Sequence, residues 1–509
     1  MKTLALLLSF VCQLTFAKTY PIIEFGAVPD GKTINTRAIN DAVRACHAAG
    51  GGTVLVPAGT FVTGTVRLLS YVNLHLEPGA VLKGSANLAD YQLDGVKHGL
   101  IYAFEADAVS ITGPGTLDGN SDAFFYPKRM HFGKMGLGFE RSYTRQGERY
   151  MPEGGTFADG PIYYDARPGM LCVLLRCERV RIRDASFLKS PEWTFRIGDC
   201  DDVVIDGITV KTDLAVPNAD GIHTTTSRNV RIANCFVSSG DDSIVVTGFG
   251  DEINEDSRRD DTSFDYAKRR MGNRTGLAEN VVVSNCVLQS RSAGIRIGYG
   301  NNSIRNCLFQ NIVIFGSNRG IGVFARDRAT IDNIRFQHIT IDTRLHDGHW
   351  WGKGEPIHVS LTPQAENVAV GRVRNIEFCD VTARSESGIV VWGEANNRLQ
   401  DIRFRNVELT VSGGPLSNDW GGNFDLRPAL RNDRKLFRHD IPGLYATQID
   451  GLRLQDVTVR WGQNLPNYMT HGVEIDNATD VQVVNYKGKG ASSVHKSLKI
   501  SDVKFAAHQ

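Results

Sequence analysis

Short segments in which apolar and polar residues alternate recur along the chain. Each segment has two β-type halves that meet at an asparagine, aspartate or glycine, and many neighbouring segments are about 21 to 32 residues apart. Because alternation with a period of two is typical of strands, the repeat predicts stacked β units rather than helical repeats. The segments are 202–210, 229–237, 280–288, 333–341, 375–383, 401–409 and 451–459.

No helical pattern separates these segments, so they do not predict β-α-β units. Coils of a parallel β-helix fit better, because each coil buries one face and pairs its strands with the coils above and below. Asparagines at equivalent turns are then expected to form a ladder along the stack. A β-propeller is the alternative, but its repeat of about 40 residues fits the spacing less well. The predicted fold class is therefore all-β, a single parallel β-helix.

The first part of the chain has a different pattern. Within 36–49, the apolar residues Ile39, Ala42, Val43 and Cys46 share one helical face, and three glycines end the pattern at 50–52. One amphipathic helix before a column of β coils predicts an end cap, which an open stack of strands needs. We assign 18–90 to this N-terminal cap region.

Four insertions interrupt the repeat, at 119–168, 250–276, 343–372 and 411–446. The first is rich in aromatic and basic residues, and the third contains His349-Trp-Trp. Long loops on a rigid scaffold often carry binding sites. Ordinary solvated loops are the alternative for each insertion taken alone. Together, the aromatic and basic residues favour the walls of a groove for an acidic sugar chain.

The net charge and the N-terminal segment indicate where in or outside the cell the protein is located. The 509 residues carry a net charge of +1, which argues against general binding to nucleic acid or a membrane surface. Residues 1–17 have an early lysine, an apolar run and a small residue at the end, the pattern of a secretory signal peptide. No other apolar run reaches the length of a membrane span. We therefore expect a secreted or periplasmic, soluble protein in which residues 18–509 form one domain.

Eight cysteines follow the predicted signal peptide. Export would permit disulfides, but several of these cysteines lie at equivalent places in the repeat, which favours small buried core residues. The sequence holds no C-x-x-C pair and no His/Cys cluster that would indicate zinc.

Three aspartates surround one of the repeat segments. Asp220 precedes Asp241 by 21 residues, close to one coil, and Asp242 follows directly. Carboxylates that are crowded together repel each other, which raises the pKa of at least one and allows a general acid and a general base to coexist. Glycoside hydrolysis requires such a pair. From the residues alone, a calcium site and polar turn capping stay open as alternatives.

The motifs around these acids resemble those of a known family. Asn218-Ala-Asp220 and Gly240-Asp-Asp242 are similar to the N-T-D and G-D-D signatures of the polygalacturonase family, glycoside hydrolase family 28. Further similar phrases are 24–31, 50–59 and Ser190-Pro-Glu-Trp193, so the resemblance covers nearly the whole mature chain.

The resemblance implies a right-handed parallel β-helix of the pectin-lyase type. It also implies inverting hydrolysis of a pectic polysaccharide without a metal or other cofactor, by a protein that is a monomer. Asp241 would then be the general acid, while Asp220 and Asp242 would hold and activate the water.

The chain departs from the family pattern in the next two coils. Ser292 and Ala293 stand where the family has the histidine of its G-H-G motif. Gly322 and Phe324 stand where its R-I-K motif has the arginine and lysine that grip a sugar carboxylate. A second register places the remnant of that motif at 294–297 and keeps Arg296. We prefer the first register.

Losing this charged clamp suggests that the sugar on the leaving-group side is not a uronic acid in the usual pose. Rhamnogalacturonan is one candidate. The candidate substrate-binding residues are Asn218, His223, Arg296, Arg319, Arg326, Trp350 and Trp351. A histidine on a strand is more often hydrogen-bonded inside the fold, and paired tryptophans pack as often as they bind sugar. The alternatives to a hydrolase are a non-catalytic carbohydrate-binding β-helix and a polysaccharide lyase.

Overall fold

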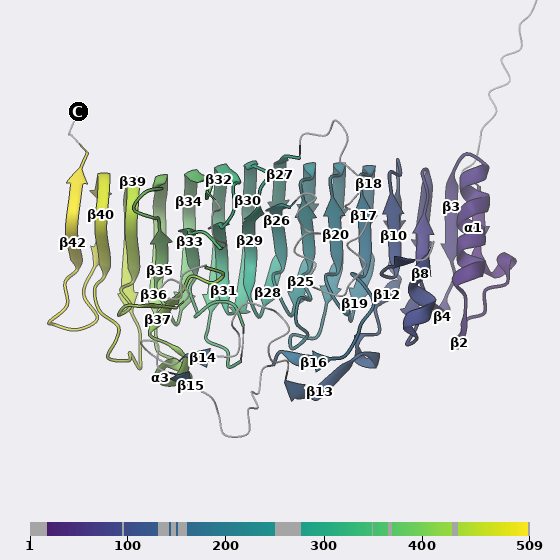
Figure 1. Cartoon of the computed structure of the whole chain (residues 1–509), viewed down its shortest axis with the longest axis horizontal. Helices are drawn as coiled ribbons and strands as arrows, with labels where there is room; N and C mark the ends of the chain where they lie inside the picture. Colours follow the sequence, from purple (N-terminus) through teal and green to yellow (C-terminus); the bar gives the residue numbers. More distant parts are fainter. Residues whose placement is uncertain are drawn as a thin grey trace, which may run out of the picture.

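A computed structural model describes residues 18–93, 96–130, 142–143, 149–150, 160–249, 276–348, 350–364, 369–429 and 436–506. The strands of one 34-stranded parallel sheet wind into a long stack of coils, as Figure 1 shows. The prediction of a parallel β-helix is thereby confirmed, and the propeller alternative is wrong. The right-handed turn of the coil stays a prediction. The predicted signal peptide, residues 1–17, lies outside the described residues, as does His349.

Three ladders of parallel strands run along the stack. The first ladder, which carries the candidate site, contains β5 (Val66–Leu68), β10 (Ile101–Phe104), β17 (Cys172–Leu175), β20 (Phe195–Gly198), β23 (Ile222–Thr225), β26 (Ile244–Gly248), β29 (Ala293–Gly300), β31 (Arg319–Ala325), β33 (Ile357–Leu361), β35 (Ile389–Trp392), β39 (Leu444–Trp461), β40 (Val473–Val484) and β42 (Leu498–Phe505).

The second ladder contains β1 (Thr19–Pro21), β3 (Gly52–Val56), β6 (Val72–Leu76), β11 (Ser110–Thr112), β18 (Glu178–Arg183), β21 (Asp201–Asp206), β24 (Arg228–Ala233), β27 (Ala278–Ser284), β30 (Ile304–Ser317), β32 (Thr330–Thr343), β34 (Arg372–Ser385) and β36 (Leu399–Val411). The third contains β2 (Asp30–Ile34), β4 (Gly59–Thr63), β7 (Ala80–Gly84), β12 (Thr116–Asp118), β19 (Ser186–Leu188), β22 (Thr209–Lys211), β25 (Phe236–Ser239), β28 (Val287–Ser290) and, at the far end, β41 (Lys487–Gly488). From β30 to β36, one long strand spans both of these ladders in each coil, and β39 spans all three ladders. At the far end, β40 and β42 continue the first and second ladders.

The hinge residue of the repeat explains how a coil bends between its strands. Asn234 separates β24 from β25 and has a φ of 57°, in the left-handed region where asparagine is well tolerated. At a second hinge, at the start of β24, Asn280 Nδ2 donates to Asn229 Oδ1 over 3.0 Å, and further along the same row Asn333 Nδ2 donates to Asn306 Oδ1 over 2.9 Å. The predicted asparagine ladder is confirmed.

The interior of the coils is a continuous apolar column. Phe309, Phe336, Phe378 and Phe404 stack on one another, with ring centroids 5.0 to 5.1 Å apart. The eight cysteines that follow residue 17 are all buried thiols, as expected of core residues.

Helix α1 (Thr36–Ala48) lies at the N-terminal end of the stack (Figure 1). The residues it buries are Ile39, Ala42, Val43 and Cys46, the same apolar face that the sequence predicts. The helix packs against β1, β3 and β5. Its role as a cap stays a prediction. Among the described residues, no helix combines the length and the apolar character that a membrane crossing requires.

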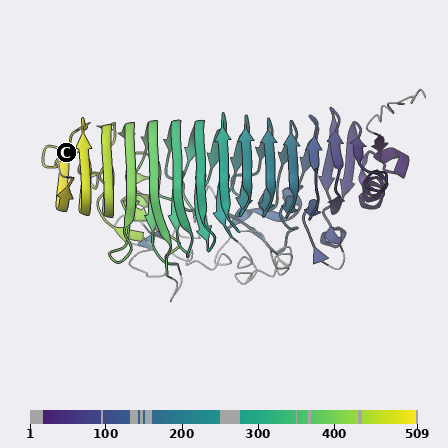
Figure 2. The same cartoon turned by 90° about the horizontal axis from the view of Figure 1, so that it is seen from above.

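The described elements of the insertions at 119–168 and 411–446 lie on one long side of the stack, as Figures 1 and 2 both show. Their elements are short: β13 (Phe125–Met130), β14 (Ser142–Tyr143), β15 (Arg149–Tyr150), β16 (Ile162–Tyr164), α3 (Ser417–Trp420), β37 (Asn423–Asp425) and β38 (Leu436–Arg438). Near the N-terminal end lie η1 (Ile22–Phe25), η2 (Leu88–Tyr91), η3 (Ser121–Ala123), β8 (Gln92–Leu93) and β9 (Val96–Lys97). Most of 250–276 and the middle of 119–168 lie outside the described residues.

Candidate active site

The three acids lie at the turn that leads into the first ladder. Asp220 stands two residues before β23, and Asp241 and Asp242 join β25 to β26. Ile222 pairs with Ile244, so the two turns are neighbours in the stack. Gly221 allows this close approach, because a Cβ there would lie 2.4 Å from the carbonyl oxygen of Ser243. The spacing of 21 residues therefore corresponds to one coil.

Asp241 is buried, with 5% of its surface exposed. Burial, followed by the negative charge of Asp242, raises the pKa of Asp241 to about 7. Arg296, the Ser292 hydroxyl and the backbone N–H of Asp242 partly offset this rise. That N–H donates to Asp241 Oδ1 over 3.0 Å. Asp241 therefore retains its proton up to near-neutral pH.

The guanidinium of Arg296 forms ion pairs with Asp242 and Asp220 and interacts more weakly with the charge of Asp241. Arg296 Nε lies 2.6 Å from Asp242 Oδ2, and Arg296 Nη2 lies 3.7 Å from Asp220 Oδ2. The second oxygen of Asp242 accepts the backbone N–H of Ala293 over 2.9 Å. Strand β29 thus holds both oxygens of the Asp242 carboxylate.

His223 is fully buried beside Asp220. Its Nδ1 lies 2.9 Å from Asp220 Oδ2, and Nε2 lies 3.2 Å from Thr247 Oγ1. The ring stacks on Trp193 with centroids 3.7 Å apart. Burial, followed by the charges of Arg296 and Arg196, lowers the pKa of His223 well below its ordinary value. The imidazole is therefore neutral and orients Asp220 by donating from Nδ1.

A cleft of about 160 Å³ opens over the acids. Of the residues predicted to bind substrate, Asn218, Arg296, Arg319 and Trp351 line this cleft together with the three aspartates. The rest of its lining is Trp193, Phe249, Ser292, Tyr299, Phe324, Gln364 and Pro428. The site thus joins a carboxylate floor to largely aromatic walls.

Three predicted binding residues lie outside this lining. His223 is packed beneath Asp220, and Trp350 is 4% exposed behind Trp351. Arg326 is fully buried, where its guanidinium donates to the carbonyl oxygens of Ser360 and Leu426 over 3.1 Å. In this structure, Arg326 ties β33 to the 423–428 segment.

The positions that depart from the family motif are occupied by uncharged groups. Phe324 is 1% exposed, with the guanidinium groups of Arg319 and Arg326 about 5.0 and 5.1 Å from the centre of its ring. Ala293 pairs with Arg319, and Arg296 pairs with Gly322, one coil further along. Arg296 therefore projects one coil before Gly322, beside the acids.

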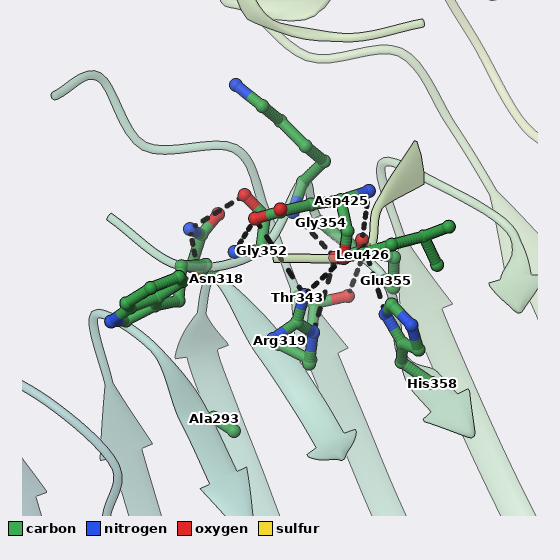
Figure 3. A network of polar contacts seen from close by, with 12 residues as sticks. Ala293, Asn318, Arg319, Thr343, Gly352, Gly354, Glu355, His358, Asp425 and Leu426 are labelled. Atoms are coloured by element: carbon green, nitrogen blue, oxygen red, sulfur yellow. Dashed lines mark hydrogen bonds and ion pairs between the residues drawn. The ribbon is translucent and has the colours of Figure 1, made fainter. Parts of the chain in front are cut away.

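Buried charged side chains beside the cleft form what we call the loop-anchoring network; Figure 3 shows four of its members, Arg319, Glu355, His358 and Asp425. The network consists of Arg319, Lys353, Glu355, His358, Asp425 and Arg427. Arg427 donates from Nε and Nη2 to the two oxygens of Asp425 over 2.8 and 2.9 Å. Asp425 Oδ2 also accepts the N–H of Gly352 over 2.7 Å.

Arg319 connects this network to the strands. Its Nη2 donates to the carbonyl oxygen of Asp425 over 3.1 Å, and its Nε lies 3.7 Å from Glu355 Oε2. The pKa of Asp425 is lowered: burial alone would raise it, but the charges and hydrogen bonds of Arg427 and the charge of Arg319 outweigh burial. The pKa of Glu355 is also lowered, because Arg319 and His358 outweigh its burial.

Sequence reasoning missed Tyr299 and Glu355. The Arg296 guanidinium lies 4.7 Å from the centre of the Tyr299 ring, three residues along the same strand. Glu355 lies two residues after Lys353 in a loop with no periodic signal. Within the described ranges, no group of three His, Cys, Asp or Glu side chains lies close enough to hold a metal ion.

Comparison with known proteins gives a family. Residues 145–420 match the model of glycosyl hydrolases family 28, and residues 21–109 match a model described as rhamnogalacturonase A/epimerase, pectate lyase-like. The first match spans more than half of the chain and contains all three aspartates. The protein therefore belongs to glycosyl hydrolases family 28.

Curated relatives are similar over part of their length. A probable polygalacturonase of Vitis vinifera is 30% identical over 254 residues, which are 46% of this chain and 45% of that protein. An exo-poly-alpha-D-galacturonosidase of Dickeya chrysanthemi is 27% identical over 344 residues, 58% of this chain and 56% of that protein. The chain thus spans about half the length of these two relatives.

Solved structures share the fold. A Thermotoga maritima exopolygalacturonase has a TM-score of 0.59 at 19% identity, covering 80% of this chain and 88% of its own. A Yersinia enterocolitica family 28 exopolygalacturonase has a TM-score of 0.61 at 18% identity, covering 96% and 78%.

Proposed function

We propose that this protein is an exported, monomeric glycoside hydrolase that cleaves α-glycosidic bonds of a pectic polysaccharide with inversion and without a metal ion. The observation that carries the proposal is the division of the three acids. Asp241 has a pKa of about 7, while Asp242 and Asp220 face the guanidinium of Arg296. A protonated acid beside ionised carboxylates is what inverting glycoside hydrolysis requires.

Each acid has one task in this mechanism. Asp241 donates its proton to the glycosidic oxygen as the bond to the anomeric carbon breaks. Asp220 and Asp242 hold a water and accept its proton as its oxygen attacks the opposite face of the sugar. His223 keeps Asp220 in place through the hydrogen bond from Nδ1. Arg296 sits between the two water-holding carboxylates.

We further propose that the sugar on the leaving-group side is neutral, as in rhamnogalacturonan, where rhamnose alternates with galacturonate. Ala293 and Phe324 offer no charge there, and a charge-assisted contact to a carboxylate is worth roughly 1.5–3 kcal/mol. The cations of the described lining, Arg296 and Arg319, already face protein carboxylates. The rhamnogalacturonase-type model matched by residues 21–109 supports the same substrate class.

Digestion of defined pectic fractions tests the proposal. We expect new reducing ends from rhamnogalacturonan, slower release from homogalacturonan, and no ultraviolet absorbance from unsaturated products. Proton NMR of the first products should show the anomeric configuration opposite to that of the substrate. Unsaturated products would identify a lyase instead. Retained binding with neither signal would identify a non-catalytic carbohydrate-binding protein.

A further inference from the structure

Arg296 lies beside the three carboxyl groups of the site, but it forms ion pairs with only two of them among the described contacts. It is 9% exposed, and its guanidinium forms ion pairs with Asp242 and Asp220. The pKa of Arg296 is raised: burial alone would lower it, but the charges of Asp242, Tyr299 and Asp220 outweigh burial. The guanidinium therefore stays charged in the site.

The backbone fixes this asymmetry. Arg296 pairs with Val245, and Val245 pairs with His223, so Arg296 and His223 project from the same column of the first ladder. Asp220 lies between these two side chains, close to both. Asp242 is held at its other oxygen by the Ala293 N–H of the same strand. Asp241 instead meets the uncharged hydroxyl of Ser292.

We propose that Arg296 is a positioning residue that assigns the catalytic proton. Its guanidinium stabilises the ionised forms of Asp242 and Asp220 more than that of Asp241, so the proton stays on Asp241 while the other two carboxylates activate water. This inference rests on the proposed hydrolysis for its kinetic consequences, but the proton assignment itself is a property of the protein without substrate. It differs from a clamp on a sugar carboxylate, because the guanidinium faces protein carboxylates.

The charged and titratable groups that face the acids come from several strands. His223 and Asp220 belong to the β23 coil, Arg196 to β20, Tyr299 and Arg296 to β29, and Arg319 to β31. Of these, Arg296 is the cation that opposes the rise in the pKa of Asp241, and Asp242 is the largest charge that favours it. Removing Arg296 should therefore let Asp241 hold its proton to higher pH.

The kinetic test compares Arg296→Gln, which removes the charge, with Arg296→Lys, which keeps the charge but loses the planar fork. In Arg296→Gln, both the acidic and the alkaline limb of the profile of kcat/KM against pH should move to higher pH, by at least about one pH unit. Arg296→Lys should lower kcat while its limbs stay within about half a unit of the wild type. Arg231→Gln, on the exposed face of β24, is the matched control and should match the wild type.

A raised KM in Arg296→Gln with unchanged limbs would overturn the proposal and favour a substrate clamp. A fall in kcat alone, with both limbs of the pH profile unchanged, would also overturn the proposal and leave Arg296 with a packing role only. An equal shift in the Lys and Gln variants would show that the charge is not the cause, and so would overturn it.

A second readout needs no turnover. Infrared titration of the ligand-free protein follows the protonated carboxyl band that Asp241→Asn removes. In Arg296→Gln this band should persist to higher pH than in the wild type, and an unchanged titration would overturn the proposal. If wild-type protein releases no reducing ends, the proposed function fails while this titration still decides the role of Arg296.

A double variant covers the case in which Arg296→Gln does not fold. Asp242→Asn/Arg296→Gln removes both members of the 2.6 Å pair, so neither is left as a buried charge without this partner. The Asp241 band should titrate at higher pH in the double variant than in Asp242→Asn alone. Equal titration in the two would overturn the proposal.

Discussion

The acid cluster and the loop-anchoring network bury carboxylates beside arginines on neighbouring coils, but they differ in the balance of charge. Asp220, Asp241 and Asp242 share the guanidinium of Arg296. In the network, Asp425 and Glu355 meet Arg319 and Arg427, and Asp425 is gripped at both oxygens.

The pKa values follow this difference. Burial and the negative charge of Asp242 raise the pKa of Asp241 to about 7, whereas in the network the arginines outweigh burial and lower the pKa values of Asp425 and Glu355. Burial is common to both regions, so the number of cations decides the direction. The acid cluster is therefore suited to proton exchange, whereas the network holds two loops in place.

Replacing the protonated acid should have the largest effect. Asp241→Asn should lower kcat on rhamnogalacturonan by roughly 10²- to 10⁴-fold, because general acid catalysis is lost. Initial rates of reducing-end release measure the effect. Asp122→Asn, an exposed carboxylate that pairs with Lys189, is the control and should keep full activity. Near-normal turnover of Asp241→Asn would place the acid elsewhere.

The second largest effect is expected on stability, when the loop-anchoring network is broken. Asp425→Asn removes the partner shared by Arg319 and Arg427, and breaking a buried ion pair from one side costs about 3–5 kcal/mol. Urea denaturation at pH 7 measures the free energy of unfolding, with exposed Asp419→Asn as the control.

The effect of Asp425→Asn should also depend on pH. The pKa of Asp425 is lowered in the folded state, so its contribution is complete above the ordinary aspartate pKa and is lost as pH falls through the folded value. The difference between wild type and variant should therefore narrow in strong acid. A difference that is small at pH 7 would contradict the assignment of Asp425 as an anchor.

The same reasoning has the opposite sign at Asp241. Its pKa of about 7 lies above the ordinary value of 3.8, so the folded state binds the proton more tightly. Stability falls as pH rises from about 4 to 7, by up to about 4 kcal/mol. Asp241→Asn avoids this cost, so its thermal midpoint should exceed that of the wild type at pH 8 and match it near pH 4. A lower midpoint for the variant at pH 8 would contradict this sign.

The smallest effect is expected on the wall of the cleft. Trp351 lines the cleft, and its ring centre lies 5.4 Å from the Arg427 guanidinium. Trp351→Ala should raise KM by roughly 2- to 12-fold with little change in kcat, since an aromatic contact contributes about 0.5–1.5 kcal/mol. Trp461→Ala, near the far end of β39, is a control for the loss of an indole. An unchanged KM for Trp351→Ala would limit Trp351 to packing.

Sequence reasoning succeeded where the repeat itself carries the information. The spacing of Asp220 and Asp241 equals one coil, so periodicity alone predicted that these two acids are neighbours. The asparagine hinges recur in every described coil from β24 to β32, so their ladder was predicted in the same way. The apolar face of α1 followed from helical spacing in the same way.

It could not resolve contacts made between loops. Arg319 and Asp425 are 106 residues apart and meet because two non-periodic insertions fold over the same strand. Trp350 and Trp351 are adjacent in sequence, yet only Trp351 lies in the described lining of the cleft. For Arg296, the sequence indicated a cation near the site, but its choice of partner depends on the register of β29 against β26.

Strands β24 and β27 pair residue for residue, from Val230 with Val281 to Ala233 with Ser284, although the segment 250–275 intervenes between them. The hydrogen bonding between neighbouring coils therefore does not depend on the length of the loop inserted at one turn. A lineage can lengthen, shorten or exchange its loops while the turns that carry the three aspartates keep their positions. Transplanting 411–446 from a relative is thus a route to a new sugar preference that leaves the carboxylates of the site unchanged.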